Sequence, residues 1–346
     1  MTLTKKDLAK GELAEEALKA YFVTLGYFVV RSVPFNYSGY DVTDVDLWLY
    51  MKSSPLNRDR TCVDIKRKKT PQAIERVFWT KGLREVLGVE RAIVVTTDNR
   101  KETREFGSKH NVIVLHGEFL QRIINIFSKT TLRIIEEKLI AELKIPCVMD
   151  KNVLWPSFYK GAKATLLVGL NFNGCNQLLS KIRLIIEEYM ASNKTSVAMV
   201  RLLYVVTAYF LIALDYTTRL ISHLDLDSRR TGLAEGFRYG DAGRQRTDEI
   251  VDTALKLLVD TSSADIFSSA KIKAEVENQL SQYPADVLAE YVAKSETLNQ
   301  LFTLGRAFEG LAYELKPPMP DQCPAELKTI LGLLCDFFKI DRKKVL

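Results

Sequence analysis

The segment Thr61–Lys69 holds the residue pair best suited to chemistry, an aspartate and a lysine two positions apart. Its sequence, TCVDIKRKK, begins with alternating polar and apolar residues. In a β-strand alternate residues share a face, so Asp64 and Lys66 point one way while Val63 and Ile65 point into a core. The pattern acid-x-lysine occurs six times in the chain, but only Asp64–Lys66 lies in a run of β type.

A second strand pattern, TDVDLWLY, places Asp44 and Asp46 on one strand face, with Asp46 eighteen residues before Asp64. If the two strands pair, their carboxylates can bind one divalent cation. Mg²⁺ prefers such oxygen ligands, completed by waters and substrate phosphate, and Mn²⁺ is the alternative cofactor. The ion would stabilise charge on a phosphate and help to activate a water. Lys66 would orient or deprotonate that water, or offset the phosphate charge.

The amphipathic segment Gly11–Leu25 supplies a candidate third carboxylate. Its apolar stripe consists of Leu13, Ala14, Ala17, Leu18, Tyr21 and Phe22. Glu15 lies at the edge of this stripe and can lean towards the sheet, whereas Glu16 and Lys19 fall on the opposite face. Geometry alone leaves open whether Glu15 reaches a metal or is an ordinary exposed helix residue.

These candidates need a sheet and helices to hold them, and residues 1–128 show patterns typical of both. Strands are predicted at Tyr27–Arg31, Asp44–Tyr50, Thr61–Lys66, Ala92–Thr97 and Val112–Leu115. Helices are predicted at Gly11–Leu25, Pro71–Leu87, Lys101–Lys109 and from Glu118. This order predicts a mixed sheet with helices on its faces, an α/β arrangement.

From about residue 129 the strand patterns end, and an all-α helical domain is predicted over residues 129–346. Its helices are expected at Leu132–Leu143, Thr165–Ala191, Ser196–Asp225, Asp248–Leu258, Ala270–Leu280, Ala285–Ala293, Glu296–Leu315 and Ala325–Phe338. Asp227–Arg246, with four glycines and five arginines, is predicted to be irregular. Recognition, regulation or assembly is the expected role of this domain.

Composition and absent motifs exclude several classes of protein. With 47% hydrophobic and 27% charged residues, the chain is typical of a folded globular protein. It has no phosphate-binding G-x-x-x-x-G-K-[ST], no G-x-G-x-x-G and no G-x-S-x-G. Of the net charge of +6, residues 1–128 carry +5, which indicates a polyanionic partner for this part of the chain.

The cysteines and apolar segments indicate a cytoplasmic location without a membrane partner. The five cysteines are odd in number and form no C-x-x-C pair, which fits a reducing compartment. Met1–Lys10 is polar and lacks the apolar run of a secretory signal. Leu202–Leu214 has 13 uncharged residues, short of the roughly 18 to 20 of a spanning helix, and is predicted to be a buried helix.

The order of these motifs over residues 8–128 resembles the PD-(D/E)xK nuclease superfamily, most closely its Holliday-junction-resolvase and Mrr-like restriction branches. The glycine and glutamate typical of the first helix fall on Gly11 and Glu15, and Leu25-Gly26-Tyr27 is similar to the end of that helix, with the leucine shifted. The metal-binding aspartate falls on Asp46, with Asp44 where many relatives carry glutamate, and the (D/E)-x-K motif falls on Asp64-x-Lys66. The later stretch AIVVTT…HNVIVL is similar to the closing strand–helix–strand.

The resemblance implies a restriction-endonuclease-like sheet and a Mg²⁺- or Mn²⁺-dependent endonuclease acting in restriction, antiviral defence or repair. It implies that Glu15, Asp46, Asp64 and Lys66 are catalytic, the three acids being metal ligands. The proline or glycine that usually precedes the metal aspartate is absent, so Asp44 competes with Asp46 for that role. Arg67, Lys68 and Lys69 follow Lys66 and are predicted either to contact nucleic-acid phosphate or to form a solvated strand end.

Two hypotheses follow for residues 1–128. The first is an active endonuclease that hydrolyses phosphodiester bonds, with DNA favoured over RNA as its substrate. The second is a catalytically inactive nucleic-acid-binding or scaffold subunit that keeps the nuclease fold. The retained set of three acids and a lysine favours the first. The helical domain is expected to mediate homo-oligomerisation or to bind a partner protein, and residues 1–128 are expected to fold without it.

Overall fold

A five-stranded mixed sheet forms the first part of the protein. The computed structural model describes residues 4–68, 72–129, 133–192, 194–261 and 266–346. The strands follow one another across the sheet in chain order, as β1 (Phe28–Tyr37), β2 (Tyr40–Lys52), β3 (Arg58–Lys66), β4 (Arg91–Thr96) and β5 (Val112–Leu115). The first three are antiparallel, whereas β3, β4 and β5 are parallel. The predicted mixed α/β class is therefore confirmed.

The hairpin of β1 and β2 is longer than the sequence pattern predicted. Ser38 and Gly39, with φ angles of 49° and 85°, connect the strands in a tight turn. Left-handed backbone at both positions matches the twist of an antiparallel hairpin, and glycine adopts it without strain. Residues 32–43, between the two predicted strands, are therefore mostly strand, and Asp44 and Asp46 lie well inside β2.

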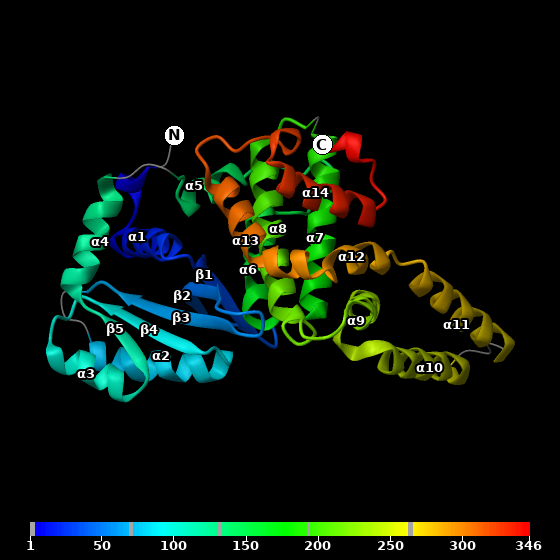
Figure 1. Cartoon of the computed structure of the whole chain (residues 1–346), viewed down its shortest axis with the longest axis horizontal. Helices are drawn as coiled ribbons and strands as arrows, with labels where there is room; N and C mark the ends of the chain where they lie inside the picture. Colours follow the sequence, from blue (N-terminus) through cyan, green and yellow to red (C-terminus); the bar gives the residue numbers. More distant parts are fainter. Residues whose placement is uncertain (1–3, 69–71, 130–132, 193, 262–265) are drawn as a thin grey trace.

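Helices cover both faces of the sheet (Figure 1). One face packs against α1 (Lys10–Thr24) and α4 (Gly117–Lys129), and the other packs against α2 (Ala73–Leu87) and α3 (Lys101–Lys109) over β3, β4 and β5. Leu18, Val63 and Ile124 belong to the apolar core on the α1 side, while Val77 and Val94 belong to the core on the α2 side. Successive residues of a strand point to opposite faces, so the even-numbered residues of β3, among them Asp64, lie on the α2 side.

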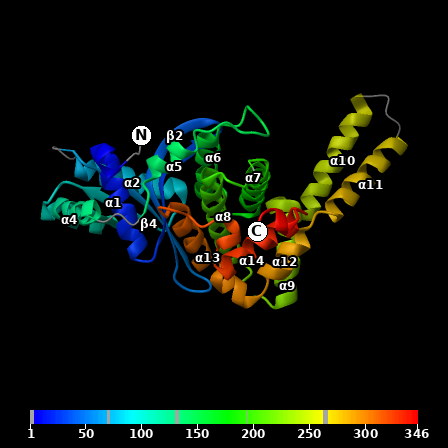
Figure 2. The same cartoon turned by 90° about the horizontal axis from the view of Figure 1, so that it is seen from above.

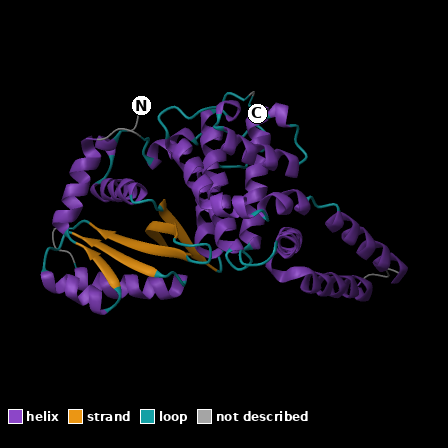
Figure 3. Cartoon of the chain, viewed as in Figure 1, coloured by secondary structure: helices purple, strands orange, loops and turns teal. Residues whose placement is uncertain are grey.

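The rest of the chain is helical, as Figure 3 shows by colour. Its α-helices are α5 (Glu136–Glu142), α6 (Trp155–Val168), α7 (Phe172–Ala191), α8 (Val197–Thr218), α9 (Leu226–Tyr239), α10 (Gly243–Thr261), α11 (Ile266–Ser281), α12 (Ala285–Val292), α13 (Ser295–Tyr313) and α14 (Ala325–Phe337). In the part of the chain that the structure describes, every strand of the sheet lies before residue 116.

Helix α8 is the centre of this helical part and packs against α6, α7 and α13. Nearly every one of its side chains is buried, including Arg201 and Asp215. Its length and apolar composition would also suit a membrane span, but 94% of its most apolar stretch is buried inside the protein. The prediction that Leu202–Leu214 is a buried helix is confirmed.

Two helical predictions were wrong in their boundaries or type. Thr165–Ala191 is not one helix, because α6 ends at Val168 and the Asn171 side chain accepts a hydrogen bond from Gly174 N at 2.9 Å to begin α7. Asp227–Arg246 is not irregular but lies within α9, a short 3₁₀ turn and α10. From this region, α10 and α11 extend side by side away from the body of the protein (Figure 2).

The helical part packs on the strands β1 and β2 and shares a core with them. Phe28 contacts Tyr209 with ring centroids 6.2 Å apart, and Tyr50 contacts Phe302 at 5.9 Å. Tyr50 Oη also donates a hydrogen bond to the buried Asp215 Oδ2 at 2.6 Å. Residues 1–128 alone would expose these aromatic rings to water. The structure therefore argues against the expectation that residues 1–128 fold independently.

Candidate functional site

Asp46, inside β2, and Asp64, near the end of β3, come together on two adjacent antiparallel strands. Leu47 of β2 pairs with Val63 of β3. Asp46 directly precedes Leu47 and Asp64 directly follows Val63, so the antiparallel strands bring the two aspartates opposite each other. Asp46 Oδ2 accepts a hydrogen bond from Ile65 N at 2.6 Å, which holds its carboxylate against β3. The juxtaposition expected from the sequence is therefore present.

A cavity of about 160 Å³ contains both carboxylates and Lys66. Lys66 Nζ lies 3.9 Å from Asp64 Oδ1. Asp44 also lines the cavity, but its side chain is exposed whereas Asp46 is half-buried. Asp46 is thus the better-placed partner for Asp64, since Ile65 N anchors it and Asp44 extends towards solvent.

The pKa of Asp46 is raised to about 7. Burial is the main cause, and the negative charges of Asp64 and Glu15 raise it further, while the Ile65 N–H and Lys66 oppose the rise. Lys66 does not fully offset this negative charge, because its Nζ also lies 3.9 Å from Asp64 Oδ1. A divalent cation between the two acids would supply the missing positive charge.

Arg76, on α2, holds the second aspartate in an ion pair that the sequence did not predict. Arg76 Nε donates to Asp64 Oδ2 at 2.7 Å, and the terminal nitrogen Nη2 donates to Oδ1. Both oxygens of the buried Asp64 are therefore engaged by one guanidinium. Arg76 is a rival for any cation at this site, and its side chain must move before Asp64 can bind a metal.

Glu15 does not join the two aspartates. It lies on the α1 side of the sheet, where its Oε2 accepts a hydrogen bond from Arg31 Nε at 2.8 Å. Arg31 also pairs with Glu16 and Glu137. Burial raises the pKa of Glu15, and Arg31 opposes that rise. In this structure the Glu15 carboxylate is paired with Arg31, although its charge still raises the pKa of Asp46, and its role as a third metal ligand stays a prediction.

Two other residues of α1 are buried where the sequence predicted exposure. Glu16 and Lys19 are 5% and 4% exposed, because the helical part covers the face of α1 that was expected to be solvated. Glu16 accepts from Arg31 and from Glu136 N, and Lys19 pairs with Glu309 at 3.7 Å.

Across the described residues, no three Asp, Glu, His or Cys side chains lie together as a metal-binding group.

The two described basic residues after Lys66, Arg67 and Lys68, differ in their surroundings. Arg67 is half-buried and donates to Lys10 O at 3.2 Å, so it contributes to the packing of the N-terminal helix. Lys68 is exposed and lines a second groove of about 520 Å³ that adjoins the carboxylates. Lys69 lies outside the described residues. Of the two predicted phosphate contacts that the structure describes, Lys68 is therefore the one placed to meet a ligand.

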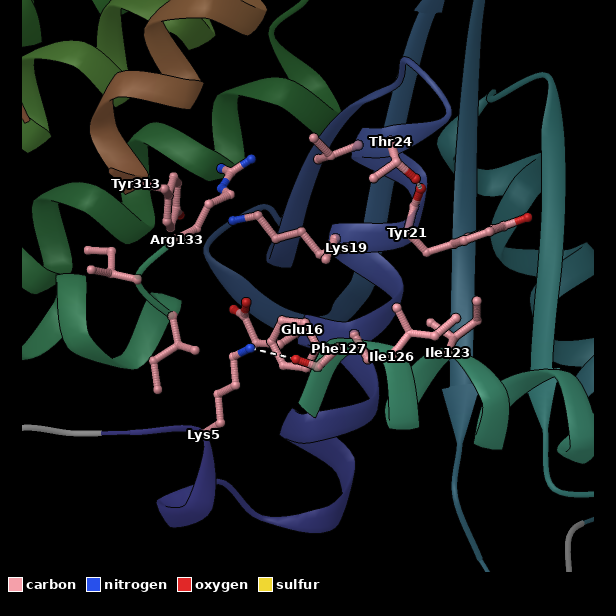
Figure 4. Close-up of a pocket in the computed structure, with 15 residues that line it drawn as sticks. Lys5, Glu16, Lys19, Tyr21, Thr24, Ile123, Ile126, Phe127, Arg133 and Tyr313 are labelled. Atoms are coloured by element: carbon pink, nitrogen blue, oxygen red, sulfur yellow. Dashed lines mark hydrogen bonds between the residues drawn. The ribbon is translucent and has the colours of Figure 1, made fainter. Parts of the chain in front are cut away.

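A separate cavity of about 370 Å³ lies on the opposite side of the sheet, between α1, α4 and the chain before α5 (Figure 4). Its walls are mostly apolar, and its charged groups have partners. Lys5 Nζ donates to Phe127 O at 2.6 Å, and Lys19 Nζ lies 3.6 Å from the ring centroid of Tyr313. Arg133 pairs with Glu309 at 2.6 Å. This cavity offers packing surface but no crowded carboxylates.

No family model, curated protein or solved structure matches the chain. The residues of the carboxylate cavity, together with the order of their motifs, are therefore what supports a function.

Proposed function

We propose that the protein is a metal-dependent endonuclease that hydrolyses phosphodiester bonds of DNA, with a restriction-endonuclease-like arrangement of the PD-(D/E)xK type. The observation that carries this proposal is the crowding of Asp46 and Asp64 in one cavity with Lys66, where the pKa of Asp46 rises to about 7. Adjacent carboxylates, of which Asp46 has no full ion-pair partner, offer the oxygen donors of a hard divalent cation once Arg76 leaves Asp64.

Asp46 and Asp64 would hold the cation, and Mg²⁺ or Mn²⁺ fits their oxygen donors. When bound, the ion would offset phosphate charge and make water a better nucleophile. Lys66, on the same strand face as Asp64, would orient the attacking water and stabilise charge that develops on the phosphate. Asp44 at the mouth of the cavity would contribute charge without direct ligation.

A second candidate function is a catalytically inactive nucleic-acid-binding or scaffold subunit. The specific observations that favour it are the Arg76 ion pair, which engages both oxygens of Asp64, and the pairing of Glu15 with Arg31. In such a protein Arg76 would permanently replace the cation. The resemblance to restriction and repair nucleases supports the active enzyme, and the two candidates differ in whether cleavage occurs at all.

The test is cleavage of plasmid, linear, branched and single-stranded DNA, with Mg²⁺, with Mn²⁺ and with excess EDTA. We expect cleavage only with a divalent cation, and we expect Asp64→Ala to abolish it. Asp59→Ala is a matched control, since Asp59 lies on the same strand and its side chain pairs with Arg91 at 3.6 Å. Lys66→Ala should lower the single-turnover rate by roughly 10²- to 10⁴-fold. Undiminished cleavage by Asp64→Ala, or cleavage in EDTA, would exclude the proposed mechanism.

A further inference from the structure

Trp79 differs sharply from the other two tryptophans of the chain. Trp48 and Trp155 are completely buried, whereas Trp79 on α2 is 48% exposed. Its neighbour Phe78 is 59% exposed. One exposed apolar side chain needs no explanation, but two adjacent aromatic rings beside a cavity of carboxylates mark a surface that contacts something.

The position of Trp79 relates it to the carboxylates. Its side chain lines the cavity that holds Asp64 and Lys66, and it also lines the adjoining groove with Phe78 and Lys68. The guanidinium carbon of Arg76, which is bound to Asp64, lies 5.5 Å from the ring centroid of Trp79. Trp79 therefore lies directly beside the candidate metal site.

The groove combines aromatic surface with positive charge. Among its described residues, the cations are Lys66, Lys68 and Arg76, and the acid is Glu75, which accepts a hydrogen bond from Gln72. The aromatic surface continues beyond the groove, because Phe78 contacts Phe106 with ring centroids 5.4 Å apart, and Phe106 contacts His110 at 4.5 Å.

We infer that the groove lined by Lys66, Lys68, Phe78 and Trp79 binds an unpaired nucleotide, with a base stacked on Trp79 and backbone phosphates beside the lysines. This inference rests on the proposed function and assigns its substrate class, which is single-stranded or branched nucleic acid. Every base presents a π-face, so stacking tolerates any sequence, and lysines track the backbone. A continuous duplex keeps its bases stacked on one another and offers Trp79 no free face.

Charge favours this occupant over a protein partner. An apolar protein contact would be expected to exclude charged lysines from its centre. Here Lys66 and Lys68 border the aromatic rings, and Lys66 is directed at the same cavity as Asp64. A nucleotide bound across the groove would place its phosphate next to the two carboxylates.

The experiment uses Trp79 itself as the reporter, because the other two tryptophans are buried. Full-length protein in EDTA is titrated with a single-stranded oligonucleotide, with a forked duplex that carries single-stranded arms, and with a blunt duplex of the same sequence. Intrinsic fluorescence and affinity are both recorded. We expect quenching by the single-stranded and forked DNA and little quenching by the blunt duplex.

Trp79→Ala should weaken binding of the single strand by roughly five- to hundredfold, with the salt dependence unchanged because the phosphate contacts remain. Trp79→Phe should recover most of the affinity, and Phe78→Ala is a second variant on the same surface. Circular dichroism checks that each variant is folded. Lys68→Ala should instead reduce the salt dependence.

Three results would overturn the inference. Equal affinity for single strand and blunt duplex, unaffected by Trp79→Ala, would leave the proposed endonuclease intact but remove its preference for unpaired bases. Binding of no nucleic acid at all would remove both the inference and the proposed function. A change in oligomeric state by light scattering on Trp79→Ala, with nucleic-acid affinity unchanged, would assign this surface to contacts between protein chains.

Discussion

Two regions of this protein that shield acids from solvent differ in the charges around those acids. At the junction between the sheet and the helical part, Glu136 is almost fully buried, yet its pKa is held at about 2. Burial alone would raise that pKa, but Lys163, Lys19 and Arg31 outweigh it. In the cavity, Asp46 is less buried and its pKa rises to about 7.

The difference lies in how completely each acid is matched by positive charge. Lys163 Nζ donates to Glu136 Oε1 at 2.7 Å and is itself buried, so the negative charge of Glu136 is matched without any ligand. In the cavity, Asp46 shares its surroundings with a second carboxylate and has no comparable partner. An acid whose charge is matched by buried cations stabilises the fold, whereas an acid whose charge is not matched can bind a cation.

The largest expected effect concerns the junction as a whole. Residues 1–128 expressed alone should fail to fold, because Tyr50 and Phe28 lose their apolar partners and Arg31 loses Glu137. Circular dichroism and urea denaturation measure this. A cooperatively folded fragment that cleaves DNA would show that the two regions are energetically separate and would restore the separable nuclease domain expected from the sequence.

Lys163→Met should destabilise the full chain by about 3–5 kcal/mol, because it leaves Glu136 buried without its closest partner. The control is Lys160→Met, on the same helix, whose side chain is 53% exposed and lies 3.8 Å from Asp41. That change should cost no more than about 1 kcal/mol. Urea denaturation compares the two variants, and equal effects would mean that the junction charges contribute little.

Arg76→Met should increase the affinity for Mn²⁺, by roughly tenfold if the ion pair with Asp64 is worth about 1.4 kcal/mol in competition with the cation. Arg84→Met is the control on the same helix, since Arg84 pairs with Glu85 away from the cavity. Isothermal titration measures both affinities. If Arg76→Met weakens Mn²⁺ binding instead, Arg76 organises the site and is not a rival of the metal.

The last prediction concerns the pH dependence of stability. Because the folded pKa of Asp46 is raised from 3.8 to about 7, its ionisation opposes folding. The penalty is absent below about pH 4, grows as the pH rises and is complete above about pH 7. Asp46→Asn should therefore raise the melting temperature more at pH 8 than at pH 4.5 in metal-free buffer. A gain that is equal at both values would mean that Asp46 titrates normally.

The sequence predicted the sheet and the meeting of Asp46 with Asp64, because strand alternation and adjacency are local properties of the chain. The Arg76 partner of Asp64 was not predictable in this way, since it depends on how α2 packs across β3. For the same reason the sequence did not show that Glu15 would form an ion pair. Its partner Arg31 is fixed by contacts with Glu137 and the helical part, and these are distant in sequence.

The prediction of irregular structure for Asp227–Arg246 was also wrong, because it rested on the glycines and arginines of this segment. The Asp225 side chain accepts a hydrogen bond from Ser228 N at 3.0 Å and begins α9. Gly236 allows α9 to pack closely on α7, because a Cβ at this position would lie 2.4 Å from the ring of Phe172. Glycine serves a tertiary contact here, which local sequence cannot distinguish from a turn.

The most direct test of the central claim is binding of Mn²⁺ by the full-length protein, followed by electron paramagnetic resonance of the free ion. The account predicts that the wild-type protein binds Mn²⁺, that Asp46→Asn and Asp64→Asn each lose this binding, and that Asp59→Asn retains it. Mn²⁺ binding that is unchanged in both Asp46→Asn and Asp64→Asn would contradict the account, because the paired carboxylates would then not be the metal site.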